Sequence, residues 1–146
     1  MAAPTYGAQG GAVATTISAV ASYPAGITAG DGIVYFVSTN GSAMGSAPAG
    51  FTQLGSTQVG GGMRKAAFTK DTVTGSESGT VTVSGLTGGT KGEAYIVRIS
   101  PGTPGDVLTF TDGSWTDTDA SSTTLTGTGA SWTSTTDTLI LSSYTG

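Results

Sequence analysis

Short apolar runs separated by glycine-rich turns are the feature that most limits what this chain can fold into. Ile33-Val-Tyr-Phe-Val37 is the clearest such run, and residues 92–100 alternate their apolar side chains with a period of two. Thr, Gly and Ser make up 70 of the 146 residues. Threonine and valine are stiff β-branched residues, and glycine breaks helices. The pattern therefore predicts an all-β chain, folded as a single β-sandwich that is jelly-roll-like.

Hydrophobic pattern and turn residues together predict about nine short strands. The first, 12–21, should place Val13, Thr15, Ile17 and Ala19 on one face, because side chains alternate along a strand. The other eight are expected near these positions: 32–39, 51–58, 63–71, 79–85, 92–100, 106–111, 122–127 and 137–144.

The expected core comes from the most apolar of these strands. Residues 32–39 are apolar over most of their length, which is typical of a central strand that is covered on both faces. In 92–100, Ala94, Ile96 and Arg98 should oppose Tyr95, Val97 and Ile99. The residues expected to be buried are Val34, Phe36, Phe51, Phe68, Ile96, Val97 and Leu139.

A chain of this length supports one domain, expected to span residues 1–146. The assignments within 101–146 rest on weaker patterns, because this part is dense in Thr, Ser and Asp. The apolar strand predicted at 137–144 lies close to the last residue, and a sandwich seldom ends directly on a core strand. Either the chain is the N-terminal part of a longer protein, or its last strand closes the sheet itself.

Residue types that are missing exclude several kinds of chemistry. The chain has no His and no Cys, so disulfides, haem or iron–sulfur ligation by these residues and Ser-His-Asp triads are excluded. A pI of about 4.3 argues against nucleic acid as a partner, since phosphate backbones bind cationic surfaces. No segment approaches the ~18 apolar residues of a membrane span, and the first residues lack the features of a secretory signal. We therefore expect a soluble protein with no membrane contact.

Two Pro-Ala-Gly elements and one aspartate predict tight turns. Pro24-Ala-Gly26 and Pro48-Ala-Gly50 have Pro at the second and Gly at the fourth position, as type I turns favour. Asp31 precedes the apolar run at 32–39 and should accept hydrogen bonds from nearby backbone N–H groups.

Four segments between about 15 and 100 resemble a group of phage virion proteins. Tyr23-Pro-Ala-Gly-Ile-Thr-Ala-Gly-Asp-Gly-Ile-Val-Tyr-Phe-Val is similar to that group's P-x-G-x-x-x-G-D turn and the apolar strand that follows it. Ala47-Pro-Ala-Gly-Phe-Thr-Gln-Leu resembles its P-P-A-G-W-T element, with Phe51 in place of the usual Trp and Ala47 in place of a common Pro. The other two segments are Gly75-Ser-Glu-Ser-Gly-Thr-Val-Thr-Val and Glu93-Ala-Tyr-Ile-Val-Arg-Ile.

The resembling proteins are small β-sandwich modules of the minor tail, fibre or capsid decoration type, from phages of Gram-positive hosts. The resemblance implies a non-enzymatic structural protein of the virion, made in the host cytoplasm without a signal peptide. It implies other virion proteins, capsid or tail subunits, as partners. A thin core also suggests a homo-oligomer, most plausibly a trimer, in which neighbours stabilise the module. The alternative function is a glycan-binding module for attachment to the host cell.

Carboxylates are too few to predict an enzyme or a metal site. Asp112, Asp117 and Asp119 form the one acidic cluster, and are weak candidates for calcium because that ion takes six to eight oxygen ligands. Glu77 and Glu93 are the only glutamates, and neither has the apolar surroundings that raise a catalytic pKa. Lys65, Lys70 and Lys91 are expected to be exposed. We therefore expect no catalytic residues, no metal and no cofactor.

Candidate partner contacts lie in two parts of the chain. Trp115 and Trp132 sit among Ser, Thr and Asp, and tryptophan is favoured at interfaces because it offers a large contact area at low entropy cost. The competing interpretation is that these two side chains cap the core. Arg64, Lys65 and Lys70 are the second candidate, a basic segment suited to an acidic neighbour.

Overall fold

A computed structural model of the protein describes residues 4–10, 12–14, 18–60, 62–71, 73–89 and 92–110. Within this part of the chain it contains eight strands and no helix, so the all-β prediction is confirmed. The strands are β1 (Thr5–Gln9), β2 (Ala12–Ala14), β3 (Ser18–Ser22), β4 (Gly32–Thr39), β5 (Thr52–Gly60), β6 (Met63–Lys70), β7 (Thr80–Ser84) and β8 (Gly92–Ser100).

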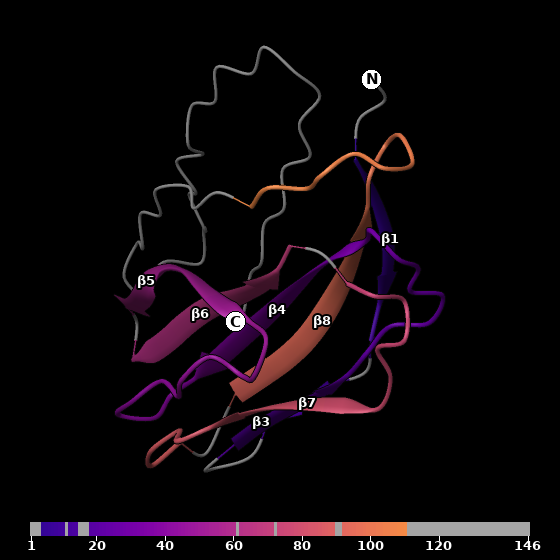
Figure 1. Ribbon diagram of the computed structural model, residues 1–146. Helices are drawn as coiled ribbons and strands as arrows, with labels where there is room; N and C mark the ends of the chain where they lie inside the picture. The colour runs from indigo at the N-terminus through magenta and orange to yellow at the C-terminus, as the bar shows by residue number, and fades with distance from the viewer. Residues whose placement is uncertain are drawn as a thin grey trace, which may run out of the picture.

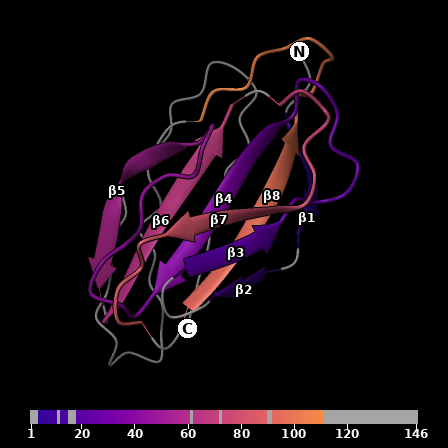
Figure 2. The ribbon, with the colours of Figure 1, turned by 60° about the horizontal axis from the view of Figure 1, so that its bottom comes forward.

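Two antiparallel sheets pack face to face as a sandwich (Figures 1 and 2). The larger has five strands in the order β1-β8-β4-β6-β5, and the smaller has three in the order β2-β3-β7. In Figure 2 the small sheet lies across β4 and β8. The chain passes from one sheet to the other after β1, β3, β6 and β7, a feature that jelly rolls share, while the β5–β6 hairpin stays within the large sheet.

The strand predictions hold best at the centre of the large sheet. The stretches predicted at 32–39 and 92–100 are β4 and β8, which pair along their whole length from Gly32 opposite Ile99 to Thr39 opposite Gly92. The strands near 51–58, 63–71 and 79–85 are also present, with shifted ends. The strands predicted at 122–127 and 137–144 lie outside the described residues.

Two expectations near the ends of the described chain were wrong, and one strand was missed. The single strand predicted at 12–21 is a hairpin, in which Ala12 lies opposite Ala21 and Ala14 opposite Ala19. Residues 106–110 form no strand. β1 was not predicted at all, because Gly7 interrupts its pattern. A Cβ at that position would overlap the Arg98 guanidinium, so a larger residue there would require the Arg98 side chain to move.

The main core lies between the sheets and combines small side chains with a few large rings. Ala19 and Ala21 of β3 are fully buried, as are Tyr35 of β4 and Phe68 of β6. The Tyr35 ring meets Phe51 edge-on, with centroids 6.3 Å apart and an interplanar angle of 67°. Aromatic pairs favour such edge-to-face contact. The small alanines of one sheet therefore leave room for the rings of the other.

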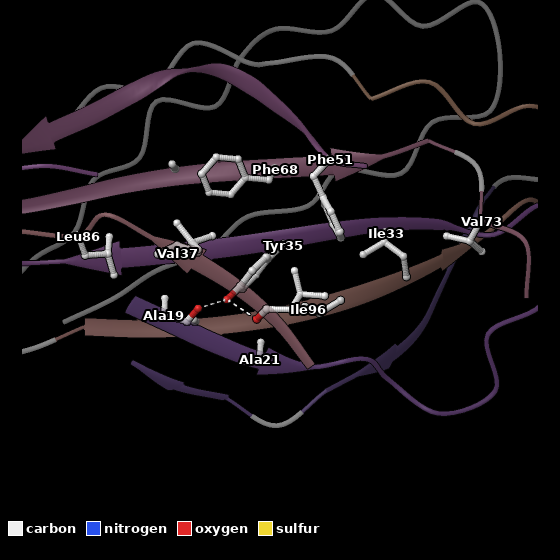
Figure 3. Close-up of a cluster of buried hydrophobic side chains, with 14 residues drawn as sticks. Ala19, Ala21, Ile33, Tyr35, Val37, Phe51, Phe68, Val73, Leu86 and Ile96 are labelled. Carbon is white, nitrogen blue, oxygen red and sulfur yellow. Dashed lines mark hydrogen bonds between the residues drawn. The ribbon is translucent and has the colours of Figure 1, made fainter. Parts of the chain in front are cut away.

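Tyr35 also ties the two sheets together through its hydroxyl group (Figure 3). The phenol oxygen lies 2.9 Å from the carbonyl oxygen of Ala19, to which it donates, and 3.3 Å from that of Val81. Burial raises the pKa of Tyr35 to about 12, so the hydroxyl keeps its proton. A polar group in the core is thus satisfied by backbone carbonyls of the opposite sheet.

Most of the predicted core residues are buried. Val34, Phe51, Phe68, Ile96 and Val97 are buried, which confirms those predictions. Phe36 is only half-buried, so that prediction was wrong: its side chain lies on the outer face of the large sheet, as that of Val34 does, but it is less completely covered there. Leu139 lies outside the described residues.

The turn before Phe51 differs in type from the prediction. Phe51 N donates to Pro48 O over 3.0 Å, so Pro48 is the first residue of the turn and Gly50 the third. Gly50 has a φ of 78°, the positive value that the third position of a type II turn requires. The predicted type I turn was therefore wrong, although the turn does direct Phe51 into the core.

Replacing Tyr35 with Phe tests the hydroxyl contact between the sheets. We expect Tyr35→Phe to lower the free energy of unfolding by about 1 kcal/mol, because the ring remains and one buried hydrogen bond is lost. Urea denaturation measures the difference. The matched control is Tyr6→Phe, the same change on a side chain that is 52% exposed, which should stay within ~0.5 kcal/mol of the unmodified protein. Equal losses in the two variants would contradict this role of Tyr35.

Candidate functional site

The candidate residues from the C-terminal part cannot be placed. Trp115 and Trp132, and the acidic cluster of Asp112, Asp117 and Asp119, lie outside the described residues. Their proposed partner-contact and metal roles therefore stay predictions. The candidates that the structure does place are Arg64, Lys65 and Lys70, all on β6.

The three basic residues of β6 do not form one patch. Arg64 and Lys70 follow the alternation of the core residue Phe68, whereas Lys65 falls on the opposite face of the sheet. Arg64 Nε donates to the carbonyl oxygen of Gly41 over 3.0 Å. Lys70 Nζ forms an ion pair with Glu77 Oε1 at 2.8 Å. Two of the three side chains are thus engaged within the chain, and Lys65 is the basic residue best placed for an outside partner.

The Glu77 carboxylate organises the loop between β6 and β7. Its Oε1 accepts hydrogen bonds from Lys70 Nζ and from Thr74 N at 3.0 Å, and its Oε2 accepts one from Gly75 N at 2.9 Å. Burial would raise the pKa of Glu77, but Lys70 and the backbone N–H groups outweigh it and lower the pKa to about 2. The carboxylate therefore stays ionised, which suits an anchor and not a general acid.

Lys70 and Tyr23 complete this cluster. The Lys70 side chain is 26% exposed and Lys65 is half-buried, so the expectation that these two lysines would be exposed was wrong, while Lys91 lies outside the described residues. Burial raises the pKa of Tyr23; the Lys70 charge opposes the increase and the Glu77 charge adds to it. The Tyr23 phenol is therefore neutral beside the ion pair, and the cluster joins β6, the β6–β7 loop and the residues after β3.

A buried carboxylate closes one end of the sandwich. Asp31 is 1% exposed, and its Oδ2 accepts hydrogen bonds from Thr28 N at 2.8 Å and Thr28 Oγ1 at 3.1 Å. This confirms the predicted turn bonding. Arg98 Nε lies 3.9 Å from the same oxygen, and its guanidinium donates to the carbonyl of Gly26. The arrangement neutralises a buried charge and holds the start of β4 against β8.

The outer face of the large sheet is apolar over most of its width. One row across four paired strands consists of Leu54, Ala67, Phe36 and Tyr95. The Phe36 and Tyr95 rings lie 5.2 Å apart with a tilt of 33°. The next row holds Val34 and Val97, which are buried. Leu108 and Phe110 pack onto this second apolar cluster from the segment after β8. The sandwich therefore has apolar surface on both faces of its large sheet.

Neither a metal cluster nor a membrane helix is found in the part of the chain that the structure describes. Among these residues, no three His, Cys, Asp or Glu side chains are grouped as metal ligands would be. A helix with the length and hydropathy of a membrane span is not found there either. The carboxylates of Asp31 and Glu77 are instead bound by backbone groups of turns and by ion pairs within the fold.

Comparison with known proteins gives no assignment: no family model, curated protein or solved structure matches the chain. The function of the chain is therefore inferred from its residues and their arrangement.

Sequence reasoning missed two of these features, although the signal for one was present. Arg98 shares the alternation of Ala94 and Ile96, so a charged residue on a core-facing position indicated a buried partner, which is Asp31. The Lys70–Glu77 pair had no such signal, because its two residues are joined by a loop whose path depends on the packing of both sheets.

The Glu77 contacts predict a pH-dependent part of the stability. A carboxylate with its pKa lowered in the folded state contributes stability above its unfolded value of 4.5, and loses it as the pH falls toward about 2. Glu77→Gln should therefore reduce stability at pH 6 and flatten the decline between pH 5 and 2. Thermal unfolding at a series of pH values measures this.

Glu93→Gln is the matched control for that experiment, because Glu93 is exposed and the same charge is removed. We expect its pH profile to follow that of the unmodified protein. An unchanged profile in Glu77→Gln would show that the contacts of the Glu77 carboxylate with Lys70 and the backbone contribute nothing to stability.

Proposed function

We propose that this protein is a non-enzymatic structural component of a phage virion, a capsid decoration or minor tail or fibre subunit that acts through contacts with its neighbours. The observation that carries the proposal is the part played by the segments that resemble such proteins. The segment from Tyr23 to Val37 supplies the Asp31 turn and most of the central strand β4. The segment at 47–52 supplies the turn that directs Phe51 into the core. The resemblance thus falls on the residues that build the framework.

The edges of the large sheet support a role in assembly. β1 and β5 are its edge strands in the described part of the chain, and each carries a large apolar side chain that is more than half exposed: Tyr6 at 52% and Val59 at 58%. An edge strand offers unpaired backbone groups to another chain. An exposed apolar side chain at that edge adds area to such a contact. We infer homo-oligomer formation, with a trimer as the most plausible state.

Sedimentation of the purified protein tests self-association. We expect the mass of an oligomer, and we expect Val59→Asp to shift the distribution toward monomer because it places a charge at the β5 edge. The matched control is Thr82→Asp, which adds the same charge at an exposed position on β7 of the small sheet. A monomer at tens of micromolar, unchanged by either substitution, would contradict self-association.

Incorporation into particles tests the function itself. An antibody raised against the recombinant chain should label purified virions from the source culture. In a complementation assay, the double variant Trp115→Ser and Trp132→Ser should fold, as judged by circular dichroism, and should be lost from particles. Lys65→Ser is a second variant for the same assay, since Lys65 is the basic side chain of β6 on the outer face.

The outcomes separate the possible roles. If the double variant unfolds, the tryptophans are core caps. If virions contain none of the protein, the structural role is wrong. In that case, binding of the isolated chain to host cells that free sugars compete away would favour the glycan-binding alternative.

A further inference from the structure

The outer face of the large sheet is only partly covered by the described chain. Val34, Val97 and Ile99 are buried there beneath Leu108. One row further along the strands, Phe36, Ala67 and Tyr95 are half-buried. Strands that are apolar on both faces are normally covered on both. The outer face is thus fully covered at the row of Val34 and Val97 and only partly covered at the row of Phe36 and Tyr95.

The part of the outer face that is covered is covered by the segment after β8, which lies over Gly32 at the start of β4. A Cβ at Gly32 would lie 2.7 Å from the Phe110 ring and 2.9 Å from a Leu108 methyl group. Gly32 therefore lets the segment after β8 lie directly on the sheet. Phe110 is also the last residue that the structure describes, so the chain leaves the described part while already on this face.

We propose that residues 137–144 of this same chain cover the remainder of the outer face, on the row formed by Leu54, Ala67, Phe36 and Tyr95. The stretch Leu139-Ile-Leu141 is the most apolar one beyond Phe110, and an extended strand would turn Leu139 and Leu141 to the same side. The connection 111–136 can span as much as ~80 Å when extended, far more than the ~27 Å length of β4.

Covalent attachment favours this occupant over a second copy of the chain. A segment of the same chain competes at an effective concentration on the order of 1 mM, whereas a second copy must bind from solution. This proposal concerns packing within one chain, so it stands or falls independently of the role in a virion.

Engineered cysteines test the proposal without interference, because the chain has no cysteine of its own. Ala67→Cys is combined in the full chain with a cysteine at Leu139, Ile140 or Leu141 in turn, since a disulfide needs Cα atoms about 4.4–6.8 Å apart. Under mild oxidation we expect at least one pair to close within the monomer, as seen by mass and by mobility on a non-reducing gel. The matched control replaces Ala67→Cys by Thr82→Cys, an exposed position on the small sheet.

Each result decides the question. Closure with position 67 and not with position 82 supports the proposal. Covalent dimers through position 67 would assign the face to a second copy. Equal closure with both positions, or none with either, would show that residues 137–144 do not rest on this face.

Accessibility gives a second measurement that does not depend on register. The thiol of Ala67→Cys should react several-fold faster with iodoacetamide when Leu139→Ser and Leu141→Ser are added, because the cover is weakened. The thiol of Thr82→Cys should be unaffected by the same two changes. An unchanged rate at position 67 would overturn the proposal.

Discussion

The contact of the Tyr35 side chain with the small sheet is the interaction on which the rest of this fold depends. Tyr35 stands on the central strand of the large sheet, and its hydroxyl meets the Ala19 and Val81 carbonyls on the other side of the core. Its ring also packs against Phe51 and Phe68. One side chain therefore joins the two sheets by hydrogen bonds and also packs against the other rings of the core. Alanine at positions 19 and 21 is what makes room for it.

β4 is buried on both faces because it is the central strand of the large sheet, and this limits which surfaces are available for contacts with other chains. Its odd-numbered residues from Ile33 to Val37 lie in the core between the sheets, while Val34 and Phe36 belong to the outer apolar cluster. Polar side chains near the core, such as Asp31 and Glu77, are held by backbone groups and cations of the same chain. The surfaces proposed for assembly are the edges of the large sheet, where Tyr6 and Val59 are exposed.

The sequence pattern predicted a strand correctly where the apolar signal within that strand was strong. The stretches 32–39 and 92–100 could be predicted because both carry a continuous or alternating apolar signal. The hairpin of β2 and β3 could not, since the small residues of 12–21 fit one long strand as well as two short ones. The side on which Phe36 lies was also hidden, because an apolar run buried on both faces carries no alternation that assigns a face.

The sequence by itself determined the class of fold, the absence of histidine and cysteine chemistry, and the positions of the turns at Asp31 and before Phe51, but not the type of the second turn. These depend on residue type and on interactions over a few positions, which pattern records directly. Only the tertiary structure decided that Arg98 meets Asp31, that Lys70 meets Glu77, and that the three basic residues of β6 are divided between two faces. Such contacts join residues brought together by the crossing of the chain between two sheets, and that crossing is set by packing across the core.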